Sequence, residues 1–441
     1  MVLKVKLDPS GRVLPSLDAV LHKALTRATH KLLTVIAAEA EKRKVPTYLV
    51  GGFVRDLLLG RPSLDLDLVL EGDAIRFGRA LVKRFGGRLV AHKDFGTAIW
   101  WLPPKSRGKD GQPAFIDLIT ARRETYSQPA ALPQVQRAEL IADQFRRDFT
   151  INTLALGLNG LQAGRVLDPW GGQRDLNSRL IRTLHAQSFI DDPTRIFRTL
   201  RFARRLDFRI EISTLRQLHS ALPKLKLLSG ERLRNELELV LAEQQRVEIL
   251  QALQFFGVLS QIDQQLRFHP KAASLLAKKN NMAVSTAWDL EVSATDLCLV
   301  LWFMHIAPKY VDRIATRLRF NAELHLAVVA ASRLFEEAKR LQPLPVSGLV
   351  ARLEKEPLLA VYALFLAYKG KPLGKLLESY ARKWRHVQPF ADGNVLRKKG
   401  LPPGPAYKKI LSQLRAARLD GDVRSAKQEK ALLEELLDEH R

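Results

Sequence analysis

The chain has 441 residues, of which 46% are hydrophobic, and this composition excludes an intrinsically disordered protein. Its length predicts about three modules. The 71 Lys and Arg residues outnumber the 46 Asp and Glu residues, which gives a formal charge of +25 and indicates a polyanionic partner, nucleic acid before membrane.

Cysteine usage and apolar segments narrow the class of protein further. The single cysteine, Cys298, excludes a disulfide framework and a Cys-type zinc site. The N-terminal stretch MVLKVKLDPSG lacks the apolar region of a signal peptide, and the longest apolar run, near 297–307, is too short to span a bilayer. We therefore expect a soluble, cytoplasmic protein without a membrane partner. The oligomeric state does not follow from the sequence.

Before residue 170, short β-rich segments alternate with helical ones, which predicts a small domain with both elements. The expected helices span 16–43, 54–60 and 74–85, and PPKSRGKDGQP (103–113) is expected to be an exposed basic loop between two strands. The expected strands lie in the segments PTYLVGG, LDLDLVL, GRLVAH, AIWWL and AFIDLIT.

From about residue 192 onward, a 3.6-residue periodicity predicts helices almost throughout. The predicted fold class is α+β, with a mixed sheet of about five strands followed by all-helical modules. The predicted module boundaries give four parts, 1–165, 166–245, 246–345 and 346–441, which are called head, neck, body and tail below.

The stretch LVGGFVRDLLLGRPSLDLDLVL (49–70) carries the strongest chemical signal. In a strand through LDLDLVL, Asp65 and Asp67 point to one face and the leucines to the other. Neighbouring carboxylates repel, and hard oxygen ligands suit Mg²⁺, although a solvated polar face is the simpler alternative. The turn at Gly51 and Gly52 opens a helix, where backbone amides and Arg55 are able to approach a phosphate. Each half is weak alone, but this spacing predicts a metal and triphosphate site.

G-G-x-V-R-D followed by D-x-D resembles the nucleotidyltransferase superfamily of DNA polymerase β type. More closely, it is similar to the class II tRNA nucleotidyltransferase and bacterial poly(A) polymerase family. The resemblance covers about 30–245, and beyond it only ADGNVLRKKGLPPGPAYKKILSQL is similar to the family's tail. The further motifs, in the family's order, are RRDFTIN (146–152), DPWGGQRDL (168–176), DDPTRIFRTLRFARRL (191–206) and ERLRNELELVL (231–241).

The resemblance implies roles for the residues that match these motifs. Asp65 and Asp67 would be the catalytic ligands of two Mg²⁺ ions. Asp117, in FIDLIT, would be a third catalytic carboxylate, although a strand-edge aspartate explains it equally. The residues that would hold the triphosphate are Gly51, Gly52 and Arg55. Those that would contact the ribose and phosphates of the incoming nucleotide are Arg147, Asp148 and Asn152.

Asp192 and Arg195 lie three residues apart and share one face of a helix. The carboxylate would accept from the amino group of cytosine or adenine and the guanidinium would donate to the ring nitrogen, whereas guanine and uracil present the reverse pattern. An ion pair at a helix start, with Asp191 or Asp192 as the N-cap, is compatible with this role. The family usually has Glu where this chain has Asp191. Arg198 and Arg201 extend a basic stripe toward primer or triphosphate.

Two basic segments near the C-terminus predict contact with tRNA phosphates, with a solvated basic surface as the alternative. The segment RKKGLPPGPAYKKILSQLRAAR surrounds a Gly-Pro turn, and KGKPLGKLLESYARKWRH adds Tyr380 and Trp384. The tail residues predicted to bind tRNA are Arg397, Lys398, Lys399, Lys408 and Lys409.

The predicted function is template-independent addition of CCA to tRNA 3′ ends from CTP and ATP, with release of pyrophosphate. The segment QPAALPQVQRAELIADQ disfavours a CC-only enzyme, because such enzymes lack the family's flexible loop in this region. The alternatives are an A-only enzyme, a poly(A) polymerase and a catalytically inactive RNA-binding protein. A small-molecule nucleotidyltransferase does not suit the charge of +25.

Overall fold

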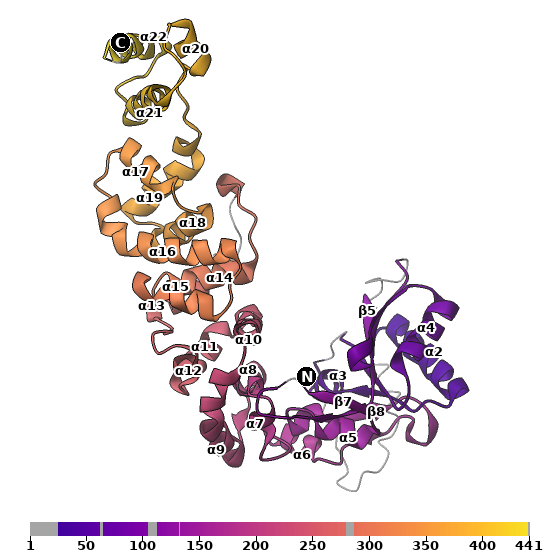
Figure 1. Cartoon of the computed structure of the whole chain (residues 1–441). Helices are drawn as coiled ribbons and strands as arrows, with labels where there is room; N and C mark the ends of the chain where they lie inside the picture. Colours follow the sequence, from indigo (N-terminus) through magenta and orange to yellow (C-terminus); the bar gives the residue numbers. More distant parts are fainter. Residues whose placement is uncertain (1–24, 62–64, 105–112, 132, 279–285, 440–441) are drawn as a thin grey trace. The chain divides into compact units, whose positions relative to one another are not determined.

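The computed structural model describes residues 25–61, 65–104, 113–131, 133–278 and 286–439 (Figure 1). It divides into two compact units, one ending at Leu228 and one beginning at Ser229. Residues 105–112 of the loop predicted at 103–113, and residues 16–24 of the helix predicted at 16–43, lie outside the described residues. The finer division into neck, body and tail stays a prediction.

The first unit is built on a mixed seven-stranded sheet in the order β3-β4-β5-β2-β1-β8-β9. Among the strands that the structure describes in it, only β2 and β5 are parallel neighbours. The strands are β1 (Thr47–Val50), β2 (Asp67–Leu70), β3 (Arg88–His92), β4 (Thr97–Trp101), β5 (Phe115–Thr120), β8 (Ala155–Gly157) and β9 (Val166–Leu167). The mixed sheet is confirmed, but the expected number of about five was too low. β8 and β9 have three and two residues, too few to show a period of two.

Two helices cover one face of this sheet, α2 (Arg27–Arg43) and α4 (Ala74–Phe85) (Figure 1). α4 has the predicted bounds. α2 ends at the predicted residue but begins at Arg27 behind the N-cap Thr26, so the helix predicted over 16–43 does not continue through that residue. Leu68 and Leu118 are buried under these helices in one apolar core. Side chains alternate between the two faces along a strand. Asp67 and Asp117, which directly precede Leu68 and Leu118, therefore face the other side of the sheet.

Short elements complete the first unit. Helix α3 (Gly52–Leu58) follows β1 directly and begins two residues before the predicted helix. The strands β6 (Arg122–Thr125) and β7 (Gln134–Arg137) form a hairpin, and β10 (Leu180–Ile181) pairs in parallel with β11 (Arg209–Ile210). The helices are α5 (Leu140–Phe145), α6 (Gly172–Asn177), α7 (Ser188–Asp191), α8 (Thr194–Leu206) and α9 (Ile212–Ala221).

The second unit is helical, as expected, and no β-strand occurs among its described residues. Its helices are α10 (Gly230–Ala242), α11 (Arg246–Phe255), α12 (Val258–Ile262), α13 (Pro270–Leu276), α14 (Ala294–Phe303), α15 (Pro308–Arg317), α16 (Ala322–Leu341), α17 (Val346–Leu353), α18 (Leu358–Tyr368), α19 (Pro372–Arg382), α20 (Gly393–Lys398), α21 (Pro405–Asp420) and α22 (Ala426–Asp438). None of the helices described in either unit is long and apolar enough to cross a membrane.

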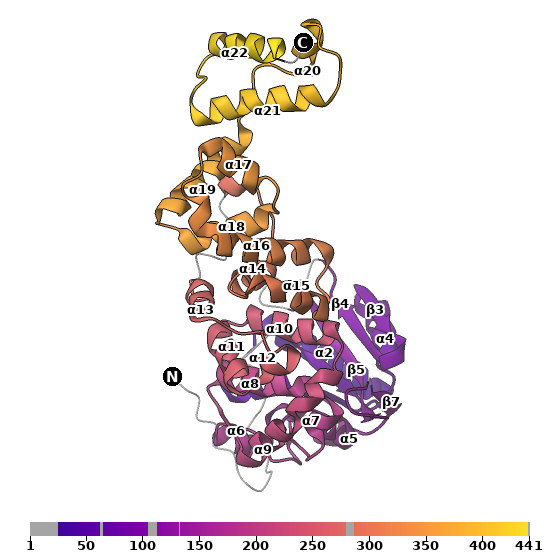
Figure 2. The ribbon, with the colours of Figure 1, turned by 60° about the vertical axis from the view of Figure 1, so that its left-hand side comes forward.

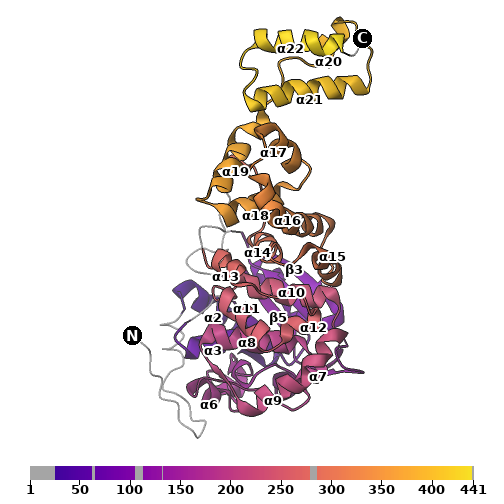
Figure 3. The same cartoon turned by 90° about the vertical axis from the view of Figure 1, so that its left-hand side faces the viewer.

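Helices α21 and α22 lie side by side at the C-terminal end (Figure 2 and Figure 3). With α20 they enclose a small apolar core around Ile410, Leu414 and Leu433. Of the predicted tRNA-binding residues here, four are exposed, and Lys399 is half-buried in an ion pair with Glu434. The suggestion that Tyr380 belongs to a basic surface patch was wrong, because its side chain is only 4% exposed and packs in the core.

Acid is expected to destabilise the folded protein because His305 becomes protonated less readily in the folded state than in the unfolded state. The ring lies 4.5 Å from Phe335, and its Nε2 has no hydrogen-bond partner among the described residues. Burial, with the charges of His269 and Lys271, lowers the pKa of His305 from 6.5 to about 4. The unfolded chain then binds the proton first, so stability falls as the pH drops from 6.5 toward 4, by about 2 kcal/mol. Urea unfolding at pH 7 and pH 4.5 tests this.

The matched variant is His305→Asn, which has no proton to gain. We expect its unfolding free energy to depend less on pH than that of the wild-type protein over this interval. Equal pH dependence in the two proteins would remove His305 from the explanation.

Candidate active site

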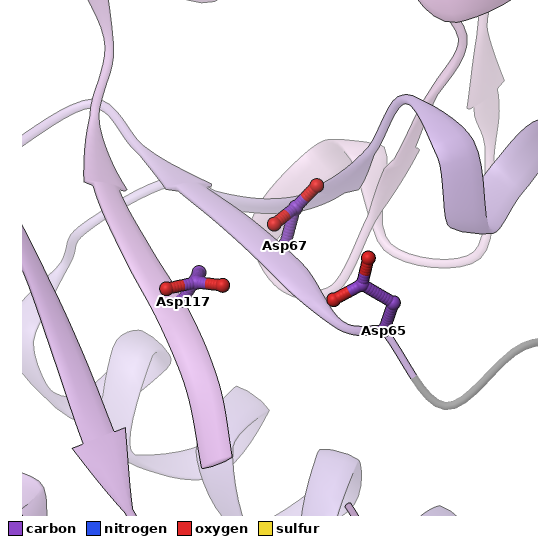
Figure 4. Close-up of side chains that lie close together, drawn as sticks. All are labelled: Asp65, Asp67 and Asp117. Atoms are coloured by element: carbon purple, nitrogen blue, oxygen red, sulfur yellow. The ribbon is translucent and has the colours of Figure 1, made fainter. Parts of the chain in front are cut away.

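Three carboxylates meet on the sheet face away from α2 and α4 (Figure 4). Asp67 opens β2 and stands directly opposite Asp117 of the parallel strand β5. Asp65 precedes the strand by two residues, and one oxygen from each of the three carboxylates lies within 4.8 Å of the others. β2 begins at Asp67 rather than earlier in LDLDLVL, yet Leu66 is still buried and Asp65 still shares the face of Asp67.

The charges of this triad crowd one another. Burial raises the pKa of Asp67 to about 6, with further contributions from Asp65 and Asp117 and opposition from Arg147. Burial and the charge of Asp65 also raise the pKa of Asp117. A cluster of carboxylate oxygens that repel one another fits a hard divalent cation such as Mg²⁺. The donor set therefore agrees with a metal site at the predicted residues.

The turn between β1 and α3 requires glycine at position 51. Gly51 has a φ of +65°, and a Cβ there would lie 2.8 Å from Nη1 of Arg147. Its amide donates to the carbonyl of Leu154 at 3.0 Å, so the expectation that this N–H approaches a phosphate was wrong. This hydrogen bond extends the pairing of β1 with β8 by one residue. The candidate donors are instead the first-turn amides of α3, which starts at Gly52.

Arg55 lies under the site as an anchored cation. The residue is 2% exposed, and its Nε and Nη2 donate to the two oxygens of Asp56, each at 2.8 Å. Its Nη1 donates to Oδ1 of Asn152 at 2.7 Å, and the guanidinium lies 5.1 Å from the ring centre of Phe202. Arg55 and Asn152 thus hold each other, and their predicted contacts with phosphate and ribose stay predictions.

Asp148 is the centre of a second buried network. One oxygen accepts two hydrogen bonds from Arg198, at 2.8 and 2.6 Å, and the other accepts from Asn152 at 2.9 Å and from the amide of Phe149 at 2.8 Å. Burial opposes ionisation, but the charge of Arg198 and the bonds from Asn152 and Arg198 outweigh it and lower the pKa of Asp148 to about 2. Four bonds saturate the carboxylate, which favours a positioning role over direct contact with ribose.

We expect Asp148→Asn to destabilise the fold by about 2–4 kcal/mol, because the variant leaves the Arg198 charge without its carboxylate. Denaturant unfolding at pH 7 measures the loss. In the wild-type protein, the depressed pKa contributes stability that is complete above pH 3.8 and disappears as the pH falls through about 2. In a double-mutant cycle with Arg198→Met, the two changes should be less than additive. Additive changes would contradict a coupled pair.

The base-selecting pair predicted on α8 stands at the start of that helix. Arg195 is 5% exposed, and its Nη1 donates to Oγ of Ser188 at 2.7 Å. Its Nη2 donates to the backbone carbonyl of Arg146 at 2.6 Å, so two different segments orient the guanidinium. Asp192 lies before the helix in extended backbone and accepts from the amide and hydroxyl of Thr194 at 3.1 and 2.7 Å. The N-cap of α8 is Pro193, so the expectations that Asp191 or Asp192 caps this helix and that Asp192 lies on it were wrong.

Several residues of the site were not predicted. Asp143 is fully buried and accepts from Arg146 at 2.8 Å and from Arg147 at 2.9 Å. Glu124 accepts from Arg146 at 3.0 Å and from the hydroxyl of Tyr126 at 3.0 Å. The available signal was the run RRET, in which a glutamate that follows two arginines points inward from β6. Which arginine each acid meets depends on the fold.

A cavity of about 590 Å³ joins these parts. Of the residues predicted for catalysis and nucleotide contact, two do not line it: Asp117, which adjoins it through the triad, and Arg201, which is 6% exposed with its guanidinium 5.8 Å from the ring centre of Phe202. The predicted residues that do line it are Gly51, Gly52, Arg55, Asp65, Asp67, Arg147, Asp148, Asn152, Asp192, Arg195 and Arg198.

A mixed sheet that presents three clustered carboxylates beside a Gly-Gly strand-to-helix turn defines a nucleotidyltransferase head. Comparison with known proteins agrees. Residues 47–182 match the family model described as "Poly A polymerase head domain", and residues 207–266 match "Probable RNA and SrmB- binding site of polymerase A". The chain belongs to the family of tRNA nucleotidyltransferases and poly(A) polymerases, since its similarity to such relatives extends over nearly its whole length.

Two relatives illustrate the range of that similarity. The chain is 30% identical to an A-adding tRNA nucleotidyltransferase of Halalkalibacterium halodurans, over 92% of each protein. It is 32% identical to an A-adding tRNA nucleotidyltransferase of Geobacter sulfurreducens over 95% of this chain. That match spans only 48% of the Geobacter protein, so the chain is about half as long as this relative.

Solved structures of CCA-adding enzymes have the same fold. The Thermotoga maritima enzyme in complex with tRNA is 28% identical and superposes with a TM-score of 0.71, covering 98% of this chain and all of that one. Structures of CCA-adding enzymes with ATP and with CTP, each 29% identical, give TM-scores of 0.76 and 0.75 over 98% of this chain and 99% of theirs.

Proposed function

We propose that this protein adds the sequence CCA to the 3′ end of tRNA, one nucleotide at a time, from CTP and ATP. The observation that carries the proposal is a single cavity lined both by the carboxylates Asp65 and Asp67 and by the base-reading pair Asp192 and Arg195. A site that contains its own pairing edge needs no nucleic-acid template. The formal charge of +25 supports an RNA partner for the transfer.

The chemistry follows from the groups in this cavity. The primer 3′-hydroxyl attacks the α-phosphorus of the triphosphate, a new P–O bond forms, and the bond to the leaving pyrophosphate breaks. Magnesium, when bound by the carboxylates, would supply charge neutralisation and a more acidic hydroxyl. Asp117 is the candidate acceptor of the hydroxyl proton, and Arg147, held by Asp143 beside the Gly51 turn, is the candidate phosphate ligand.

Base selection is assigned to Asp192 and Arg195. The carboxylate accepts from the amino group of adenine or cytosine, and the guanidinium donates to the neighbouring ring nitrogen. Guanine and uracil place a carbonyl where the carboxylate needs a donor, so their binding leaves buried polar groups unpaired.

The second candidate is addition of the terminal A alone. It is favoured by the Halalkalibacterium and Geobacter relatives, which carry that name and align with 92% and 95% of this chain. The structures of CCA-adding enzymes match this chain over a similar length. The step that adds A is common to both candidate functions.

Incorporation on three tRNA transcripts separates the candidates. The transcripts end before CCA, after the first C and after CC, and each is offered one labelled nucleotide, CTP, ATP, GTP or UTP, with Mg²⁺. Ordered addition of C, C and a single A, without G or U, is the expected result. A alone on the CC-ended transcript would establish the second candidate, and long A ladders would indicate a poly(A) polymerase. No incorporation at all would overturn the enzymatic proposal.

A further inference from the structure

A short segment between α19 and α20 holds an exposed aromatic ring in a fixed position. Phe390 is 58% exposed, although the guanidinium of Arg418 lies only 3.9 Å from its ring centre and covers part of it. A large apolar side chain in water is unremarkable where the backbone is free to move. Here the surrounding backbone is held on both sides, and that restraint is what calls for a function.

Three side chains from α21 and α22 hold the backbone of residues 387–391, the arch that carries Phe390. Nε of Arg415 donates to the carbonyl of Val387 at 2.8 Å, and Nη1 of Arg418 donates to the carbonyl of Gln388. Beyond the ring, the amide of Ala391 donates to Glu429 at 2.8 Å, and Glu429 is 2% exposed. The arch is therefore anchored to two helices, and Phe390 pays little further conformational entropy when a partner binds.

The charge around the arch identifies the chemistry of that partner. Between residues 382 and 418 the sequence contains ten Lys and Arg residues and one acidic residue, Asp392. Arg397, Lys398, Lys408 and Lys409 are exposed on α20 and α21, which share one small core with Ala391 of the arch. Exposed aromatic rings among such cations bind single-stranded or unpaired nucleic acid, because the ring stacks on a base while the cations contact phosphates.

We propose that Phe390, backed by Arg418, is a stacking site for an unpaired base of the tRNA substrate. The proposal rests on the function proposed above, because it assigns one contact of the tRNA that the enzyme extends. It adds to the phosphate contacts predicted for the tail a contact of a different kind, which depends on ring area rather than on charge. Its loss should therefore have a signature that the loss of a lysine does not have.

The test compares tRNA binding by Phe390→Ala, Phe390→Trp, Phe390→Leu and Phe255→Ala at several salt concentrations. Phe255 is the matched control, since it is 83% exposed and packs on Phe256 at the end of α11. We expect Phe390→Ala to raise the Kd for tRNA by about 10-fold or more, with an unchanged slope of log Kd against log salt. By contrast, Lys408→Ala should lower that slope by about 1.

Rescue by ring area completes the design. Phe390→Trp should bind tRNA as well as the wild-type protein, Phe390→Leu should resemble Phe390→Ala, and Phe255→Ala should have no effect. The KM for nucleotides should not change in any of them. An unchanged Kd in Phe390→Ala, or normal binding by Phe390→Leu, would overturn the stacking site. If the wild-type protein fails to bind tRNA at all, the proposed function itself fails, and the two failures are thus distinct.

Discussion

Replacing Asp67 with Asn is expected to lower the rate of nucleotide addition by about 10³-fold while leaving the fold at least as stable as before. The rate falls because the cluster of Asp65, Asp67 and Asp117 loses one of the oxygen charges that would hold Mg²⁺, a change of several kcal/mol in the transition state, here about 4 kcal/mol. Single-turnover incorporation of ATP on a CC-ended tRNA, at saturating nucleotide, measures the rate.

Stability should change in the opposite direction from activity. Burial and the neighbouring carboxylates raise the pKa of Asp67 from 3.8 to about 6, so at pH 7 its charge destabilises the folded state relative to the unfolded one. Asn has nearly the same shape without that charge. In EDTA, the variant should melt at the same temperature as the wild-type protein or higher. Added Mg²⁺ should raise the melting temperature of the wild-type protein and not that of the variant.

The exposed Asp94 on the same head provides the matched control. Asp94→Asn removes one negative charge outside the triad and should retain full activity and the full response to Mg²⁺. If Asp67→Asn keeps more than a tenth of the wild-type rate, or melts well below the wild-type protein in EDTA, the assignment of Asp67 as a metal ligand is wrong.

The placement of the carboxylates in the head was predictable where they lie close together in the sequence. Asp65 and Asp67 lie two residues apart, and Gly51 precedes them within the same short segment, so local spacing placed the two carboxylates near the Gly51 turn, and both line one cavity with it. Asp117 is distant in sequence, and only its alternation with buried Ile116 and Leu118 indicated its face. The parallel pairing of β2 and β5 then brought it opposite Asp67.

What the sequence could not indicate is which buried acid meets which cation. Asp143 and Glu124, together with the hydroxyl of Ser188, reach arginines of the site from three different segments, and a basic chain offers each acid many possible partners. Gly51 shows the complementary error. Backbone geometry correctly explained why this position is a glycine. Its amide, however, donates to the carbonyl of Leu154 as part of the pairing of β1 with β8, and β8 is too short, at three residues, to be predicted from the sequence.

Replacing Arg195 with Lys is expected to remove most of the discrimination between bases. Arg195 presents a planar group with five N–H donors, and two of these are fixed by Ser188 and by the carbonyl of Arg146. Lys keeps the positive charge but is unable to span both anchors and a base at once. We expect the ratio of kcat/KM for ATP over GTP, and for CTP over UTP, to fall by about 10- to 100-fold.

Ser188→Ala separates positioning from contact. Ser188 is fully buried and would not touch the base, but it accepts one of the two hydrogen bonds that orient the guanidinium. Its removal should lower the same ratio by a smaller factor, about 5-fold, which corresponds to about 1 kcal/mol for one hydrogen bond. Thr199→Val is the matched control, because it removes a buried hydroxyl from α8 that bonds a backbone carbonyl rather than the guanidinium.

The pattern of kcat/KM across the four nucleotides decides whether Arg195 selects the base or only supports the cavity. If Arg195 reads the base, Arg195→Lys gains activity toward GTP and UTP relative to ATP and CTP, because the ring N–H of guanine or uracil no longer faces a fixed fork of donors. Arg204→Lys, an exposed change on the same helix, should leave all four nucleotides unaffected. If Arg195→Lys lowers kcat/KM equally for every nucleotide, Arg195 only supports the cavity, and the choice of base must be made by other residues.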